Sequence, residues 1–256
     1  MSDPSPQPGR FVWHELHTSD PDAARDFYAA LFGWTPSVME MGPEPYTMFM
    51  DGDVPRAGMV RAMDGVSPGW ESYATVDNVD RSLERAAELG AAVKMTGHDI
   101  PGIGRMGILD DLHGATICPF TFAGDAPPED ETFVPGQFCW DELHTPDPEA
   151  AKAFYGKLFG WTYTSMDMGE FGTYWIANRG ARGAAGIMQL PPGVGGPPRW
   201  LPAVWVEDVD AGTAAAGTHG ATVQVPASDI PGVGRYAVFT DPQGALLSLY
   251  RGRTQA

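Results

Sequence analysis

Two short stretches of the chain carry a glutamate and a histidine two positions apart, with a tryptophan two positions before the glutamate. The residues are Trp13, Glu15 and His17 in the first stretch and Trp140, Glu142 and His144 in the second. In a strand, residues two apart point to the same face. A carboxylate and an imidazole on one face could relay a proton or bind a polar ligand, and the indole could form an apolar wall beside them. The pattern predicts a small-molecule site, with Glu15, His17, Glu142 and His144 as candidate catalytic residues.

A structural interpretation of the same residues stays open. A glutamate and a histidine near the end of a strand could cap a neighbouring helix or pair with an arginine, and Trp13 could belong to the core. On the other face of the strand, His14 is replaced by Asp141 in the second stretch. We therefore expect His14 to face solvent.

These stretches belong to an internal repeat. Phe11–Trp34 and Phe138–Trp161 are identical at 16 of 24 positions, and the motif DIPG(I/V)GR occurs once in each copy, from Asp99 and from Asp229. Self-similarity of this kind indicates a duplicated fold. Residues 123–137 are rich in proline and acidic residues and are typical of an exposed linker. We predict a disordered N-terminus over residues 1–10, a first domain over 11–122, a linker over 123–137 and a second domain over 138–251.

Each copy divides again into two similar modules. Phe11–Thr18 alternates as a strand, Asp20 is placed to cap a helix that runs to Phe32, and Gly33 ends it. Short strand-like runs follow at Tyr46–Met50 and Ala57–Met63. The pattern then restarts with strands and helices in the same order, at 70–76, 79–89, 91–95, 105–109 and 115–122, and the second copy repeats it. The fold class predicted is α+β, with four βαβββ modules.

Composition excludes several kinds of partner. The chain of 256 residues has 33 acidic and 16 basic residues and a formal net charge of −17. A nucleic acid or an anionic membrane needs clustered Lys and Arg, so neither is expected as a partner. Two cysteines are too few for a disulfide framework, and no signal peptide or long apolar stretch is present, which favours a cytoplasmic location. The fused pair is expected to be a monomer or a homodimer.

Several motifs resemble the vicinal-oxygen-chelate superfamily, which includes glyoxalase I, bleomycin-resistance proteins and extradiol dioxygenases. They are DPDAARDFYAALFGW, its counterpart DPEAAKAFYGKLFGW, and the endings DDLHGATI and DPQGALLSL. The resemblance covers Phe11 to Tyr250, and the DIPG(I/V)GR element is similar to that of a tandem actinobacterial glyoxalase-like subgroup. It implies that two modules join into an eight-stranded half-open sheet around a pocket, giving two tandem glyoxalase-like half-open barrel domains.

The resemblance also implies where a divalent metal would be held. The ligand positions fall on Trp13 and Trp140, on Glu71 and Leu201, on Cys118 and Ser248, and near Met59–Arg61 and Met188–Gln189. Indole has no lone pair for a metal, so we expect no metal ligands and no cofactor; the alternative is one divalent metal such as Zn, Ni, Mn or Fe. Trp13, Trp140, Glu71 and Cys118 are then expected to bind the ligand.

Three functions follow as alternatives. The first is a glyoxalase/bleomycin-resistance-like protein that binds a small organic molecule in the strand cup without the usual metal. The second is an enzyme, a lyase, isomerase or oxygenase/hydroxylase that acts on a small carbonyl or aromatic compound, either metal-dependent or by acid–base catalysis through the Glu and His pair. The third is a structural or interaction role.

Overall fold

The computed structural model describes residues 8–39, 45–63, 65–129, 132–169, 172–190 and 196–253. Residues 1–7 of the predicted N-terminal segment, and 130 and 131 of the predicted linker, lie outside this range. Of the remaining N-terminal residues, Gly9 and Arg10 donate backbone hydrogen bonds to Thr75.

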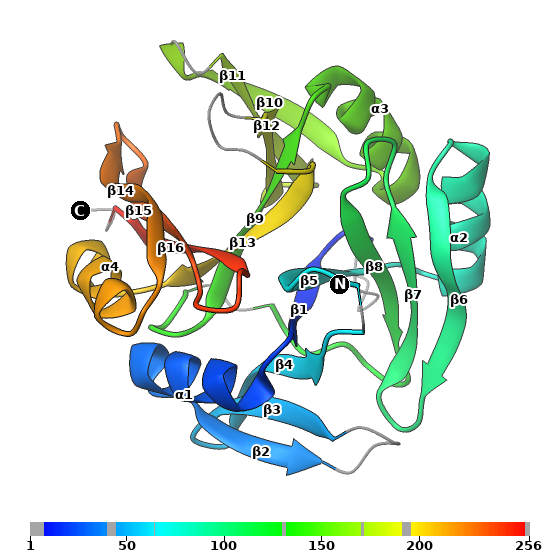
Figure 1. Ribbon diagram of the computed structural model, residues 1–256. Helices are drawn as coiled ribbons and strands as arrows, with labels where there is room; N and C mark the ends of the chain where they lie inside the picture. The colour runs from blue at the N-terminus through cyan, green and yellow to red at the C-terminus, as the bar shows by residue number, and fades with distance from the viewer. Residues whose placement is uncertain are drawn as a thin grey trace. The chain divides into compact units, whose positions relative to one another are not determined.

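Both copies follow the same order of elements (Figure 1). The first copy consists of β1 (Phe11–Thr18), α1 (Pro21–Phe32), β2 (Thr35–Met39), β3 (Tyr46–Asp51), β4 (Val54–Arg61), β5 (Gly69–Thr75), α2 (Val79–Glu88), β6 (Ala92–Ile100), β7 (Gly104–Asp110) and β8 (Thr116–Phe122). The second consists of β9 (Phe138–Thr145), α3 (Pro148–Phe159), β10 (Thr162–Asp167), β11 (Thr173–Arg179), β12 (Arg182–Gln189), β13 (Arg199–Trp205), α4 (Val209–Thr218), β14 (Thr222–Ile230), β15 (Gly234–Thr240) and β16 (Leu246–Gly252).

The strands form two eight-stranded sheets, one from each copy. Their orders are β2-β3-β4-β1-β5-β8-β7-β6 and β10-β11-β12-β9-β13-β16-β15-β14. The α+β class and the four βαβββ modules are therefore confirmed. Strand β2 was not among the runs predicted from the sequence, because four of its five residues are exposed and it carries no apolar alternation.

Helix ends lie where the sequence predicts them. Asp20 accepts a hydrogen bond from the backbone N–H of Ala23, and Gly33 ends α1 in the left-handed conformation at φ 72°. In the second copy, Asp147 and Gly160 have the same roles for α3. A carboxylate at the N-cap and a glycine after the last turn satisfy backbone groups that the helix itself leaves unpaired.

The chain forms two compact units, and each takes one module from each copy. Unit 1 is Met1–Val12, Ser72–Glu129 and Trp140–Trp200, and unit 2 is Trp13–Glu71, Asp130–Cys139 and Leu201–Ala256. In unit 1, α2 packs on β6, β7 and β8, α3 packs on β12, and the two helices touch each other. In unit 2, α4 packs on β14, β15 and β16, α1 packs on β2 and β4, and α1 touches α4. Each hydrophobic core contains buried side chains of both copies.

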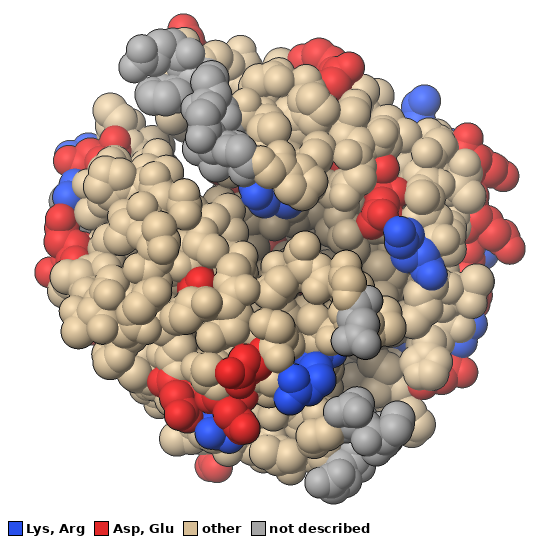
Figure 2. Space-filling view, viewed as in Figure 1, with Lys and Arg blue, Asp and Glu red and all other residues tan. Residues whose placement is uncertain are grey.

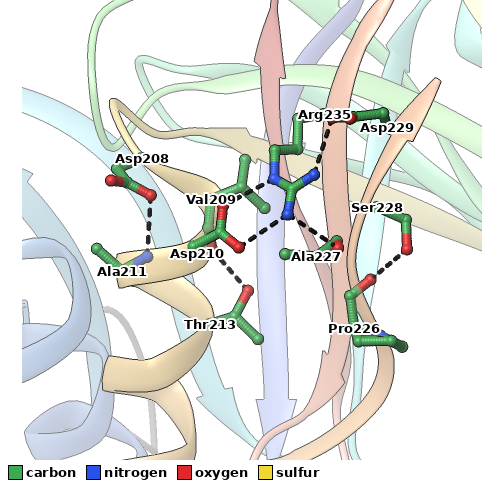
Figure 3. Close-up of polar contacts among 10 residues, drawn as sticks. All are labelled: Asp208, Val209, Asp210, Ala211, Thr213, Pro226, Ala227, Ser228, Asp229 and Arg235. Carbon is green, nitrogen blue, oxygen red and sulfur yellow. Dashed lines mark hydrogen bonds and ion pairs between the residues drawn. The ribbon is translucent and has the colours of Figure 1, made fainter. Parts of the chain in front are cut away.

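The arginine of the DIPG(I/V)GR motif joins a hairpin to a helix. Figure 3 shows Arg235 of β15 between Asp229, across the hairpin, and Asp210, in the first turn of α4. The Arg235 guanidinium also donates to the backbone carbonyl of Ala227. In the first copy Arg105 makes the equivalent bonds to Asp80 and Asp99. The motif therefore has a structural role in each module that carries it.

Candidate functional site

A tryptophan and a tyrosine are hydrogen-bonded on the same face of each sheet. In unit 2 the indole Nε1 of Trp13 donates to the hydroxyl of Tyr46 at 3.0 Å, and in unit 1 Trp140 donates to Tyr174 at 2.8 Å. The tryptophans lie on β1 and β9, and the tyrosines on β3 and β11. The side chains are half-buried. Each pair joins strands that are two places apart in the sheet order.

A glycine on the intervening strand makes room for each pair. A Cβ on Gly58 would overlap the Tyr46 hydroxyl and lie 3.1 Å from Trp13 Nε1. A Cβ on Gly186 would overlap the Tyr174 hydroxyl and lie 3.0 Å from Trp140 Nε1. In both copies the aromatic pair therefore packs directly on the backbone of the glycine, which has no side chain.

The glutamate of each copy is the register partner of that glycine. Glu15 is opposite Gly58 in the parallel pairing of β1 with β4, and Glu142 is opposite Gly186 in that of β9 with β12. The hydroxyl of Tyr46 hydrogen-bonds Glu15. Burial, and secondly the charge of Glu15, raises the pKa of Tyr46 far above its usual value, so the phenol stays neutral and donates.

In unit 2 the histidine lies between two carboxylates. Nε2 of His17 is 3.2 Å from Oε1 of Glu15 and 3.4 Å from Oε2 of Glu71. Burial lowers the pKa of His17, but hydrogen bonding and charge from Glu15 and Glu71 together outweigh burial and raise the pKa to about 10. His17 is therefore an imidazolium at neutral pH.

In unit 1 the corresponding pair is tighter. Nε2 of His144 lies 2.6 Å from Oε1 of Glu142, and the His144 side chain is 6% exposed while that of Glu142 is 24% exposed. Burial raises the pKa of Glu142, but hydrogen bonds from His144 and Tyr174 outweigh it and leave the pKa below its ordinary value. Leu201, which is buried, takes the position in β13 that Glu71 has in β5.

The structure thus brings together most of the residues predicted for the site. Trp13, Glu15, His17 and Glu71 belong to unit 2, and Trp140, Glu142 and His144 belong to unit 1. Cys118 is fully buried in β8, in unit 1, where its register partner is Tyr73 of β5.

Sequence reasoning missed the tyrosines and the glycines. In both copies the glycine follows the tyrosine at the same spacing, from Tyr46 to Gly58 and from Tyr174 to Gly186. That shared spacing, in a region where most positions differ between the copies, is the feature that could have identified them.

The expectation that His14 faces solvent is wrong. Its side chain is 5% exposed and its ring stacks on Phe138, with the centroids 3.9 Å apart. Asp141, its counterpart, is also buried and accepts a hydrogen bond of 2.6 Å from the hydroxyl of Ser72. The face of β1 and β9 that carries these two residues is buried, so a change between His and Asp does not mark a solvent-exposed position.

A second set of buried polar residues, linked by hydrogen bonds, is repeated in the two units. In unit 2, Trp70 Nε1 donates to Tyr28, and the Tyr28 hydroxyl donates to Asp241 at 2.8 Å. Asp241 accepts backbone N–H bonds from the turn before β16. In unit 1, Trp200, Tyr155 and Asp111 make the same series of hydrogen bonds. These residues are part of the cores. Asp241 holds the turn that includes Gln243 in unit 2, and Asp111 holds the turn that includes His113 in unit 1.

The ligand positions implied by the family resemblance do not suit a divalent metal. At the first-strand position each copy has an indole whose N–H is committed to a tyrosine. Met59 and Leu201 at other positions are buried apolar side chains. Glu71 and Cys118 are of metal-ligand type, but they belong to different units. Among the residues that the structure describes, no group of three or more His, Cys, Asp or Glu side chains is arranged to hold a metal ion. The donor chemistry of these positions therefore differs from that of a zinc, manganese or iron site.

The chain is similar to proteins of known families over most of its length. Residues 140–249 match the family Glyoxalase/Bleomycin resistance protein/Dioxygenase superfamily, and residues 10–52 match the family Bleomycin resistance protein-like N-terminal. CFP32 of Mycobacterium bovis, which is provisionally named a glyoxylase, is 34% identical over 95% of each chain. The anthracycline biosynthesis protein DnrV of Streptomyces peucetius is 33% identical over 94% of this chain and 93% of its own.

Solved structures share the fold. The Mn(II)-bound glyoxalase from Novosphingobium aromaticivorans superposes with a TM-score of 0.68 at 19% identity, over 95% of this chain and 82% of that chain. The 2,3-dioxygenase LapB from Pseudomonas sp. KL28 superposes with a TM-score of 0.65 at 12% identity, over 96% and 93%. With the paired βαβββ modules and the full-length relatives, these findings identify the chain as a member of the glyoxalase/bleomycin resistance/dioxygenase superfamily.

Proposed function

We propose that this protein binds a small organic molecule beside the Trp, Tyr, Glu and His cluster of its sheets, without the metal that is usual in the superfamily. The observation that carries the proposal is the indole at the first-strand ligand position, with its N–H bonded to a tyrosine. Such a position offers an apolar wall and no lone pair. The cluster is therefore suited to recognition rather than to Lewis-acid chemistry.

The state of the glutamate also favours binding over proton transfer. Glu142 accepts hydrogen bonds from His144 and Tyr174, and its pKa is lowered. A carboxylate of low pKa is a weak general base at neutral pH but a strong hydrogen-bond acceptor. We expect Glu15 and Glu142 to anchor a polar group of the ligand.

The charge of the chain limits its partners further. On the face in Figure 2, Lys and Arg are scattered singly among acidic residues and form no continuous patch. Together with the net charge of −17, this supports a small molecule rather than nucleic acid or an anionic membrane as partner. No helix in the described part of the chain is long and apolar enough to cross a membrane. We propose a cytoplasmic monomer or homodimer.

A ligand screen with metal analysis tests the proposal. Purified protein is screened against aromatic and carbonyl compounds by thermal shift, and hits are measured by calorimetry with and without EDTA. We expect at least one compound to raise Tm, by mass action on the folded state, and EDTA to leave its Kd unchanged. Trp140→Phe should weaken binding, whereas Trp175→Phe, one residue beyond Tyr174 on the opposite face of β11, should not. A stoichiometric divalent metal in freshly purified protein, or no Tm shift with any compound, would contradict the proposal.

The second candidate is an enzyme that uses the Glu and His pair. The 2.6 Å contact between His144 and Glu142 favours it, because a carboxylate-oriented imidazole is a common acid–base arrangement. The chemistry would be that of a lyase, isomerase or oxygenase/hydroxylase on a small carbonyl or aromatic compound. Turnover of a screened hit that is lost in Glu142→Gln and His144→Asn, even at ligand concentrations that saturate each variant, would establish this candidate over binding alone.

A further inference from the structure

The hydrogen bonds around each glutamate run in one direction. In unit 1 the indole N–H of Trp140 donates to the Tyr174 hydroxyl, and the hydroxyl donates to Glu142. His144 Nε2 lies 2.6 Å from Oε1 of the same carboxylate. In unit 2, Trp13 and Tyr46 follow the same order toward Glu15. The proton donors of each cluster are thus directed at the carboxylate.

In unit 1 the group that the cluster presents outward is therefore an acceptor, whereas in unit 2 the donor His17 is more exposed, at 20%, than Glu15, at 13%. The side chain of Glu142 is 24% exposed, whereas His144 is 6% exposed and its Nδ1 is buried. A carboxylate has about four lone-pair sites, of which Tyr174 and His144 use two. Glu142 can accept further hydrogen bonds on its exposed side.

From this polarity we infer that the unit 1 cluster selects aromatic ligands that carry an O–H or N–H donor and rejects anionic ligands of the same size. The inference deepens the proposed function and rests on it. The donor would bond to Glu142 while the ring packs on Trp140. A ligand carboxylate or phosphate would instead meet the glutamate oxygens and be repelled.

Two further observations agree with this selection. The lowered pKa of Glu142 keeps it ionised at neutral pH. The acidic balance of the whole chain acts in the same direction.

The test uses the indole N–H resonances of Trp13 and Trp140 in NMR titrations of the full-length protein. The probes are phenol and aniline, which carry a donor, anisole, which has no donor, and benzoate, which is an anion. At Trp140 we expect phenol and aniline to shift the resonance with a Kd about tenfold lower than that of anisole, and benzoate to be weaker still.

The Glu142→Gln variant localises the effect. Because Gln replaces a carboxylate oxygen by an NH₂ donor, phenol should lose affinity at Trp140 and benzoate should gain it, while Trp13 in the same molecule is the internal control. Equal Kd values for phenol, anisole and benzoate in the unsubstituted protein would overturn the inference and leave small-molecule binding intact. If no probe and no screened compound moves either indole, the proposed function itself fails.

Discussion

Glycine decides how closely each aromatic pair approaches the sheet. Gly186 is buried, and its φ is not in the left-handed region, so its role is space rather than backbone freedom. The Tyr174 hydroxyl and Trp140 Nε1 occupy the volume of the missing side chain. The position of Tyr174 beside Glu142 therefore depends on the absence of a side chain at Gly186.

Gly186→Ala is therefore expected to displace Tyr174 and to destabilise the fold by about 1–3 kcal/mol, as overpacking does. It should also weaken ligand binding at Trp140. Denaturant unfolding and the indole titration measure the two effects. Gly217→Ala is the control: nothing lies within 4 Å of a Cβ there, and in a helix the change should stabilise by about 0.5–1 kcal/mol. Unchanged stability of Gly186→Ala would contradict the packing argument.

The pKa of His17 tests the two-carboxylate arrangement. The pKa is raised to about 10, from 6.5 in the unfolded chain, so the pairing stabilises the fold fully below pH 6.5 and its contribution is lost as pH rises to about 10. Glu71→Leu reproduces the residue of the second copy and should lower the pKa of His17 by removing one of its two carboxylates. NMR titration of the six histidines measures this. A His17 that titrates at the same pH in both proteins would show that Glu71 does not act on it.

At the residue scale the sequence predicted the participants better than their roles. Glu15, His17 and Glu71 are close together, and identity between the copies on one strand face was enough to select the first two. Tyr46 and Gly58 lie on other strands and become neighbours of Trp13 only through strand order and register, which a single sequence does not contain. The prediction for His14 is wrong because a difference between the copies at one position does not show whether that face of β1 is buried.

At the scale of elements, local chemistry determined most of what could be predicted. Caps and stops such as Asp20 and Gly33 fixed the helix ends. Strand β2 escaped prediction because it is at the edge of its sheet and exposed, so neither burial nor alternation marks it. The DIPG(I/V)GR motif was visible as a repeat, but the contact of its arginine with the helix was not, because that contact depends on how the hairpin folds back.

The buried hydrogen bonds of Tyr28 connect α1 to the turn before β16. Tyr28→Phe would leave a carboxylate oxygen of Asp241 and the N–H of Trp70 without their partner, at a cost of about 1–3 kcal/mol for each buried group. Thermal or urea unfolding measures the loss. Tyr163→Phe is the matched control, because the buried Tyr163 hydroxyl has no hydrogen-bond partner among the described residues. A loss of stability no larger than that of Tyr163→Phe would mean that the hydrogen bonds of Tyr28 do not stabilise unit 2.

At the scale of the whole molecule, each compact unit takes modules from both copies. The core of unit 1 includes Leu109 and Ile117 of the first copy with Leu143 and Tyr155 of the second. The core of unit 2 combines Leu16 and Phe49 with Phe239 and Leu247. The repeat predicted the number of modules, but which modules share a core depends on long-range packing. The division into domains over 11–122 and 138–251 stays a prediction.

Fragment reconstitution distinguishes the two divisions. If each core needs both copies, fragments 1–125 and 126–256 expressed separately should lack the cooperative unfolding of the full chain, and mixing them should restore it. Size-exclusion chromatography and thermal unfolding of the mixture measure this. A single fragment that unfolds cooperatively as a monomer would support independent sequential domains instead.

Because each unit combines modules of both copies, the tandem arrangement also affects how the two copies can diverge in sequence. Two separate chains of identical sequence would place the same residue at both symmetry-related positions. A single polypeptide imposes a one-to-one ratio of two unlike halves, so Glu71 and Leu201 can occupy matching places in one protein. One half is thereby free to acquire a new preference while its counterpart retains the older one.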